Sequence, residues 1–136
     1  MRFDTKIAVV VRGDLADWQK LNVTAFLASG VAHATGEVVG DPYADGSGNR
    51  YLPMFREPVL CFAADSDELA RVHGRGLSRG LAMAVYTDDM FATGHDADNR
   101  AAVQAVEADR LPLAGLALYG PRNSVDRATK GLKLHG

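Results

Sequence analysis

A lysine and an aspartate follow two different predicted strands, and together they could perform hydrolytic chemistry. Lys20 lies one turn before Thr24 on a predicted helix, and Asp88 is followed by Thr93 in a polar segment. In a hydrolase or transferase site, Lys20 would orient or polarise the substrate and Asp88 would act on a water as base. Thr24 or Thr93 would hydrogen-bond the reacting carbonyl. A lysine and a carboxylate in contact keep each other charged, so such a site needs no metal or cofactor.

More polar side chains follow the predicted strands and indicate where this site would lie. The first strand ends in Arg12 and Asp14, the third in Asp88, and the fourth in Tyr119, Arg122 and Asn123. Ligands of α/β domains bind at the carboxyl ends of the strands. We therefore expect these side chains to gather at one edge of the sheet, with Arg12 and Asp14 binding a small-molecule substrate.

A structural role is the alternative for each of these residues. Arg12 and Asp14 can pair with each other within their turn. Asp88 can cap a short helix, since aspartate is a favoured N-cap residue. Lys20 can lay its aliphatic chain along an apolar helix face and place its ammonium group in water. The arrangement of these residues in space decides between the two roles.

The elements that would position these residues alternate between strands and helices. Strands are predicted at residues 6–12, 58–64, 80–87 and 113–119, and helices at residues 18–34, 66–79, 99–108 and 125–130. Such alternation implies crossover connections, which place helices on both faces of one sheet. The sequence therefore predicts a single three-layer α/β domain over residues 1–136. Residues 36–50 are rich in glycine and aspartate and read as a surface loop or a substrate lid.

The first predicted helix is apolar on two faces. One stripe, expected to lie on the sheet, consists of Trp18, Leu21, Ala25, Ala28 and Ala32. The other consists of Val23, Leu27 and Val31 and would still need cover. Either the loop at residues 36–55 folds over it or a second copy of the chain does, and a symmetric dimer is a common way to bury such a stripe.

Composition excludes several classes of function. The 136 residues include 17 acidic and 15 basic side chains, a formal net charge of −2, which argues against nucleic-acid or anionic-membrane partners. No apolar segment approaches the roughly 20 residues of a membrane span. The charged N-terminus does not resemble a signal peptide, so we expect a cytoplasmic protein. The single cysteine, Cys61, lies in an apolar run and is predicted to be buried.

Both ends of the chain resemble the type 2 peptidyl-tRNA hydrolases. Residues 6–15 match that family's opening pattern, K-x-x-x-V-V-R-x-D-L, and residues 125–134 are similar to its closing helix and strand. Gly120-Pro121 stands at the family's Gly-Pro turn, and Thr87-Asp88 resembles the start of its T-D-A-G loop. The resemblance implies a mixed four-stranded sheet with one antiparallel strand, helices on both faces and a homodimer.

The resemblance also extends to part of that family's site. Lys20 matches the family's lysine on the first helix, Asp88 matches its aspartate, and Thr93 stands one place beyond its threonine. The family's glutamine and histidine positions hold Thr24 and Leu27.

An uncharacterised branch of the same fold is a nearer match for the first helix. Residues 20–27 follow the pattern K-L-N-x-x-A-F-L of that branch, and Asn99-Arg100 matches its later motif. This resemblance adds Asn22, Asn99 and Arg100 to the candidate substrate-binding residues.

Two classes of function fit this sequence. The first is a small-substrate hydrolase or transferase with a Lys/Asp/Thr site at the strand ends. The second is a non-catalytic ligand-binding or dimeric assembly module on the same scaffold. Peptidyl-tRNA hydrolysis itself is disfavoured, because a polyanionic substrate requires clustered lysines and arginines.

Overall fold

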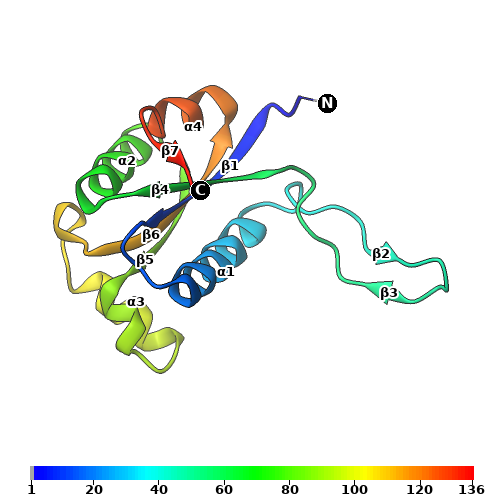
Figure 1. The fold of residues 1–136 in the computed structure, drawn as a ribbon, viewed down its shortest axis with the longest axis horizontal. Helices are drawn as coiled ribbons and strands as arrows, with labels where there is room; N and C mark the ends of the chain where they lie inside the picture. The colour runs from blue at the N-terminus through cyan, green and yellow to red at the C-terminus, as the bar shows by residue number, and fades with distance from the viewer. Residues whose placement is uncertain (1) are drawn as a thin grey trace.

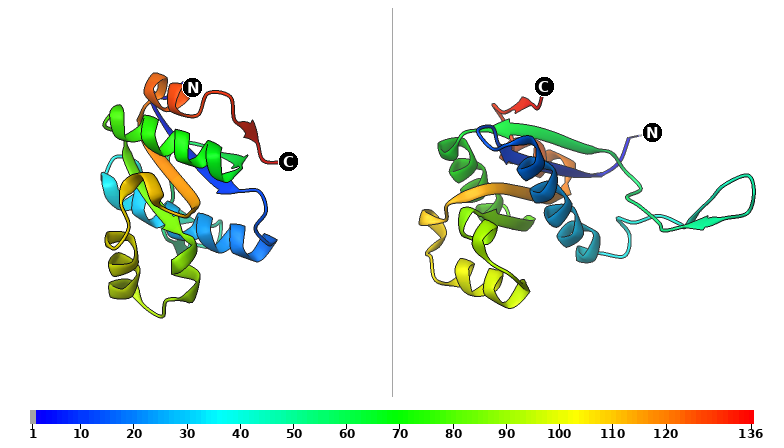
Figure 2. Two further views of the ribbon diagram at one scale, coloured as in Figure 1. Left: turned by 90° about the vertical axis from the view of Figure 1, so that its left-hand side faces the viewer. Right: turned by 60° about the horizontal axis from the view of Figure 1, so that its bottom comes forward.

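One mixed five-stranded sheet with helices on both faces forms the body of the molecule (Figure 1, Figure 2). The computed structural model describes residues 2–136. The strands are β1 (Thr5–Arg12), β4 (Val59–Ala64), β5 (Ala82–Thr87), β6 (Leu113–Pro121) and β7 (Lys133–Leu134), with β2 (Tyr43–Ala44) and β3 (Arg50–Tyr51) in a separate hairpin. The helices are α1 (Asp17–Ala34), α2 (Ser66–Ser78), α3 (Asp96–Gln104) and α4 (Arg122–Ala128), with short 3-10 turns η1 (Asp88–Ala92) and η2 (Ala108–Arg110).

The strand order in the sheet is β5-β6-β1-β4-β7. Strands β1, β4 and β5 point in the same direction, whereas β6 is antiparallel to β1 and β5, and β7 is antiparallel to β4. The predicted α/β class with a mixed sheet is confirmed. The expected four strands with one antiparallel strand are corrected to five strands with two, because residues 133–134 pair with Phe62 and Ala63 at the edge of β4.

Strand β6 is antiparallel to β5 because the connection between them starts and ends at the same end of the strands and does not cross a face of the sheet. The connection runs through η1, α3 and η2 beyond the sheet edge (Figure 1), and the amide of Asp88 donates to the carbonyl of Pro112 at 2.8 Å to close it. The predicted crossover between these two strands is therefore wrong. The polar residues at the carboxyl end of β6 consequently lie at the edge opposite to the one predicted for them: Tyr119, Arg122 and Asn123.

Helix α1 covers one face of the sheet with its branched aliphatic side. Val23, Leu27 and Val31 are buried, whereas Trp18 and Leu21 are 63% and 72% exposed. The prediction had these two faces the wrong way round. Val23, Leu27 and Val31 pack instead with Val9, Val11 and Ala117 of the sheet.

A glycine in the sheet makes the close approach of α1 possible. A Cβ atom at Gly115 of β6 would lie 2.5 Å from Val23 Cγ1 and 3.1 Å from Leu27 Cδ1. Real Cβ atoms do not approach other atoms so closely, and only glycine leaves room for the valine and leucine of the helix at this point. The spacing of α1 above the sheet is thus set by a residue almost ninety positions away in the sequence.

Helices α2 and α4 cover the other face of the sheet. Leu69 and Val72 of α2 and Val125 of α4 are at most 1% exposed and pack with Leu116 and Leu118 of β6. The predicted capping box of α2 is confirmed, since Asp65 accepts from the amide of Glu68 at 2.8 Å and donates its own amide back to that side chain at 3.1 Å. This face is a closed hydrophobic core.

Two apolar or weakly polar side chains on these elements are exposed, and one of them, Cys61, was predicted to be buried. Leu77, near the end of α2, is 54% exposed, because it follows Gly76 around the helix away from the sheet. Cys61 is also exposed, because it lies on β4 near the short edge strand β7, where the chain leaves one face uncovered. Among the described helices, none has the length and apolarity needed to cross a membrane.

The segment between α1 and β4 forms a hairpin that projects from the body. We call residues 41–54 the arm; it extends away from the sheet and helices in Figure 1 and in the right-hand view of Figure 2. Its base is fixed by the buried Val38, by a bridge between Val39 and Phe55, and by the amide of Gly40 donating to the carbonyl of Met54 at 2.9 Å. The predicted surface loop is therefore an ordered two-stranded hairpin, and it does not fold over Val23, Leu27 and Val31.

The tip of the arm is closed by one carboxylate. Asp45 accepts hydrogen bonds from the amides of Ser47 and Asn49, from the side chain of Asn49 at 3.0 Å and from the hydroxyl of Tyr51 at 2.7 Å. These bonds, that from the Asn49 side chain foremost, lower the pKa of Asp45 to about 2. The turn is thus held by its own side chains.

Candidate functional site

The carboxyl ends of β1 and β5 meet at one edge of the sheet, as predicted. The guanidinium group of Arg12 lies 2.7 Å from Asp14 and 2.9 Å from Asp88, and it donates to the carbonyl of Leu113 at 2.9 Å. Burial alone would lower the pKa of Arg12, but its two carboxylate partners outweigh that effect and raise it. The pairing of Arg12 with Asp14 matches the structural alternative for these two residues, whereas Asp88 pairs with Arg12 and is not the N-cap of η1.

Lys20 and Asp88, the two principal catalytic candidates, contact different partners. The ammonium group of Lys20 lies 3.0 Å from Nε2 of His135, in the segment after β7, and the hydroxyl of Thr24 donates to the backbone carbonyl of Lys20 at 2.8 Å. Within residues 2–136, no ion pair joins Lys20 to Asp88. Neither residue, nor Thr24, lines the cavity between α1 and α3.

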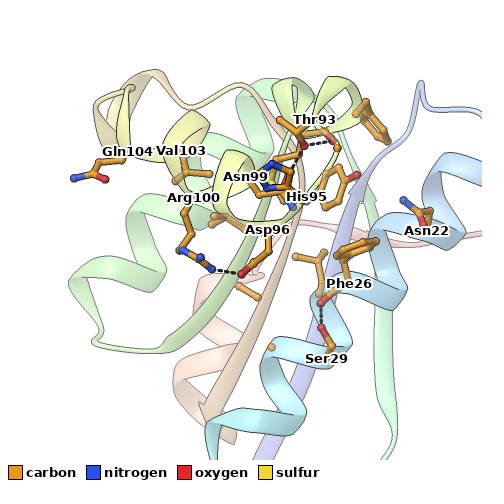
Figure 3. A pocket seen from close by; sticks show the side chains of 18 of the residues that line it. Asn22, Phe26, Ser29, Thr93, His95, Asp96, Asn99, Arg100, Val103 and Gln104 are labelled. Carbon is orange, nitrogen blue, oxygen red and sulfur yellow. Dashed lines mark hydrogen bonds and ion pairs between the residues drawn. The ribbon is translucent and has the colours of Figure 1, made fainter.

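That cavity lies between α1, β5, η1 and α3 and has a volume of about 960 Å³ (Figure 3). We call it the α1–α3 cavity. Its wall on α1 includes Trp18, Asn22 and Phe26, its floor includes Tyr86 of β5, and α3 supplies the opposite wall. The antiparallel return of β6 creates it, because α3 is held beyond the sheet edge and leaves a gap to α1.

Four aromatic side chains line the cavity. The ring centroids of Tyr86 and Phe91 are 5.0 Å apart, those of Phe26 and Tyr86 are 5.7 Å apart, and those of Trp18 and Phe91 are 6.4 Å apart. The rings lie at 55° to 75° to one another, which is the tilted to edge-to-face range that aromatic pairs prefer. Tyr86 is buried, whereas Trp18 and Phe26 remain 63% and 51% exposed.

Polar side chains complete the lining, and several are already oriented by the protein (Figure 3). The hydroxyl of Thr93 donates to the carbonyl of Met90 at 2.9 Å and also contacts the side chain of Asn99. Burial raises the pKa of Tyr86, while a hydrogen bond with Asn22 opposes that shift. Fixed hydroxyl and amide groups of this kind can orient a ligand.

The ionisable side chains at the mouth of the cavity have partners. Arg100 and Asp96 form an ion pair one turn apart on α3, and Nε2 of His95 lies 3.3 Å from Asp98. The guanidinium group of Arg100 therefore already has an anionic partner. The lining as a whole offers aromatic surface and neutral hydrogen-bonding groups.

The structure thus divides the nine candidate residues into three groups. Asn22, Thr93, Asn99 and Arg100 line the α1–α3 cavity. Arg12, Asp14 and Asp88 form the ion-pair cluster at the ends of β1 and β5. Lys20 and Thr24 lie on the side of α1 that approaches the C-terminal segment. Asn22, Asn99 and Arg100 were predicted from the motifs of the uncharacterised branch, and Thr93 was predicted from its position after β5.

The comparison with protein families gives a match over residues 5–136 to the family described as "Protein of unknown function (DUF2000)". The chain belongs to the DUF2000 family. Its fold is similar to that of a solved structure, the protein of unknown function Atu0240 from Agrobacterium tumefaciens strain C58. The two are 50% identical with a TM-score of 0.96, and the match covers 99% of this chain and 100% of that one. No curated protein matches the DUF2000 chain.

Sequence reasoning missed the aromatic lining of this DUF2000 chain. Trp18, which was predicted to lie on the sheet, is 63% exposed beside the cavity, whereas Tyr86 is buried. A signal was present in the first helix: Trp18, Asn22 and Phe26 recur every four residues and therefore share one face. Phe91, on the other side of the cavity, carries no such signal, because its place is set by the turn after β5.

Proposed function

We propose that this DUF2000 chain binds a small organic molecule with a flat aromatic ring and neutral hydrogen-bonding groups in the α1–α3 cavity. The observation that carries the proposal is the convergence of four aromatic side chains from α1, β5 and η1 on one open cavity. Two of them, Trp18 and Phe26, keep more than half of their surface exposed. A ring inserted between them would gain edge-to-face contacts and remove apolar surface from water.

The size and charge of the cavity narrow the class of ligand. At about 960 Å³ it lies near the upper end of the usual range for small-molecule sites. Asn22, Thr93 and Asn99 offer uncharged hydrogen-bonding groups, and Arg100 is paired with Asp96. A neutral ligand fits this lining better than an anion, since an anion would have to compete with Asp96 for the guanidinium group.

Catalysis by a hydrolase or transferase remains the second class of function, and the geometry supports it less well. Of the four proposed catalytic residues, Thr93 alone lines the cavity. Lys20, Asp88 and Thr24 would have to act elsewhere or through a rearrangement. If Lys20→Ala and Asp88→Asn both leave turnover unchanged on a panel of hydrolase substrates, these residues have no catalytic role.

The scaffold itself is proposed to be a variant of the type 2 peptidyl-tRNA hydrolase fold. The patterns at residues 6–15 and at Thr87-Asp88 support this relationship. The cavity holds no unpaired cationic group among its described lining residues, which does not favour a polyanionic RNA substrate. An assay of peptidyl-tRNA cleavage by the purified chain would test that activity directly.

The ligand proposal can be tested with the protein's own fluorophore. Trp18 is the only tryptophan of the chain and lines the cavity. We expect benzamide and nicotinamide to change Trp18 emission in a saturable manner and to show saturation-transfer NMR signals. Cyclohexanecarboxamide, which has the same amide on a saturated ring, should bind at least several-fold more weakly.

Variants locate the binding of these probes. Phe91→Ala removes an aromatic wall and Asn99→Ala removes a polar group, and both should weaken benzamide binding at least fivefold. Leu77→Ala, which truncates an exposed apolar residue of α2, is the matched control and should leave it unchanged. Equal binding by Phe91→Ala and the parent chain, or equal binding of the aromatic and saturated amides, would contradict the proposal.

A further inference from the structure

Exposed apolar surface is concentrated on two segments of the chain. Among residues 2–136, nine large apolar side chains are at least half exposed. Seven of these nine lie on α1 or on the arm: Trp18, Leu21, Phe26, Tyr43, Tyr51, Leu52 and Met54. Single exposed apolar residues are ordinary on protein surfaces, but their accumulation on two segments marks an interaction surface.

The outer face of α1 has the composition of an interface core. We define this face by Trp18, Leu21, Ala25 and Phe26, all of them exposed. From Trp18 to the end of α1, Lys20 is the only residue with a permanent charge, and it turns toward His135. Enrichment in aromatic residues together with depletion of charge distinguishes the buried centre of an interface from the remaining surface.

The arm carries apolar side chains that its own chain does not cover. Every residue from 41 to 52 is exposed, and β2 and β3 pair over two residues each. An isolated two-stranded hairpin is at best marginally stable in water, so an ordered arm gains from packing against another surface. The arm points away from the body of its own chain (Figure 1, Figure 2), which leaves another molecule as the surface it can reach.

We propose that a second copy of this chain is the partner, with the arm of each copy packed on the outer face of α1 of the other. Two self-complementary contacts related by a twofold axis close the assembly at two copies. If each large side chain has roughly 200 Å² of surface, the seven exposed residues offer on the order of 800 Å² per copy, the area that a stable protein interface buries on each partner.

The same contact brings the arm to the α1–α3 cavity. Trp18 and Phe26 belong both to the outer face of α1 and to the cavity lining. An arm lying across them supplies Leu52 or Met54 of the second copy as a further wall of that cavity. The dimer proposal depends only on the exposed apolar surfaces, whereas the proposal of an additional cavity wall depends on the proposed ligand site.

Light scattering on the purified full chain at tens of micromolar tests the assembly. We expect a mass of about twice the 14.5 kDa of one chain. Leu21→Glu and Leu52→Glu each place a charge at a site more than two-thirds exposed in one copy, so both should fold, as circular dichroism can verify, and elute at the mass of one chain. Leu77→Glu changes an exposed leucine on the opposite face and should keep the double mass. A parent chain that elutes as a monomer would overturn the proposal.

Energy transfer tests whether the arm itself is the contact. One chain carries Trp18→Phe, Cys61→Ser and Ser47→Cys with a dansyl label on the new thiol at the arm tip, and it is mixed with unlabelled parent chain. Transfer from Trp18 of the unlabelled chain to the dansyl group can then occur only between copies, and we expect it to disappear on adding Leu52→Glu to the labelled chain. A dimer with no transfer, or a dimer that tolerates Leu52→Glu, would show that the arm lies outside the interface and overturn the proposal.

The ligand and dimer proposals fail in different measurements. Replacing residues 41–53 with Asn-Gly, a two-residue turn between Gly40 and Met54, should give a monomer that still binds benzamide at the remaining cavity walls, with an affinity reduced severalfold. If this variant is a monomer that binds benzamide as tightly as the parent chain does, the arm is not part of the cavity wall. The dimer proposal would still hold in that case. A parent chain that forms the dimer but does not bind benzamide would contradict only the ligand site.

Discussion

The two faces of the sheet are covered in different ways. On one face, α2 and α4 lie side by side and enclose a core that includes Leu69, Leu116 and Val125, all fully buried. On the other face α1 lies alone, one side buried and the other exposed, and the gap between it and α3 is the α1–α3 cavity. From this contrast we expect the two-helix face to contribute most of the folding stability and the one-helix face to bind the proposed ligand. The following predictions test this expectation.

The largest effect is expected on the two-helix face. Leu116→Ala removes a fully buried side chain of β6 and should lower the free energy of unfolding by about 2–5 kcal/mol, because the cavity left behind adds to the lost burial. Urea denaturation followed by circular dichroism measures this loss. Benzamide binding per folded molecule should be unchanged, and a loss of binding comparable to that in Phe91→Ala would mean that the two faces are not separate.

Gly115 and Gly76, one on each face of the sheet, allow the packing of α1 and α2 to be compared. Gly115→Ala places a methyl group against Val23 and Leu27 of α1 and should cost about 1–3 kcal/mol by forcing the helix outward. Gly76→Ala in α2 meets mainly the flexible side chain of Met83, and the helix propensity of alanine offsets about 1 kcal/mol of that strain. We therefore expect a smaller loss for Gly76→Ala. The reverse order of the two Tm values would contradict this explanation of how α1 is seated.

A buried hydroxyl at the end of β5 provides a smaller effect of opposite sign. Thr87 is 1% exposed, and its Oγ1 has no hydrogen-bond partner among the described residues. Thr87→Val keeps the shape and removes the unsatisfied group, so it should raise the free energy of unfolding by about 1 kcal/mol. A destabilised Thr87→Val variant in urea titration would indicate that the hydroxyl has a bonding role in solution.

The smallest effect concerns pH on the two-helix face. Burial lowers the pKa of His73, on α2, below its ordinary value of 6.5. The unfolded chain therefore binds a proton more readily, so stability is fully present above pH 6.5 and is lost as pH falls from there toward the folded-state pKa. Urea titrations at about pH 5 and about pH 8 should show a smaller difference in His73→Gln than in the parent chain. An unchanged difference would assign the pH dependence to other groups.

Sequence reasoning succeeded where the information is local. The strong strands and the capping box at Asp65 follow from apolar runs and residue spacing within a few positions, and the structure confirms them. The meeting of Arg12 and Asp88, which are distant in the sequence, was predicted from a general rule instead: parallel strands end at one edge of the sheet.

It failed where distant residues decide the outcome. Helix α1 is apolar on both sides, and the side that faces the sheet is selected by the space above Gly115, which the helix sequence does not contain. The direction of β6 depends on whether α3 crosses the sheet, and a sequence that reads only as strand, helix, strand leaves this open. The cavity was missed for the same reason. Trp18 and Phe91 line one cavity only because α3 lies beyond the edge of the sheet.

In the proposed dimer, the carboxylate that closes the turn of the arm lowers the cost of docking. Because the turn is held by bonds to Asp45, and the pKa of that group is about 2, the tip keeps its shape across the range from mildly acidic to neutral solution. An arm that already has its bound shape loses little backbone entropy when it docks, so more of the contact energy remains as binding free energy. Loosening the turn, for example by Asp45→Ala, should therefore weaken docking although all seven apolar side chains of the proposed interface keep their identity.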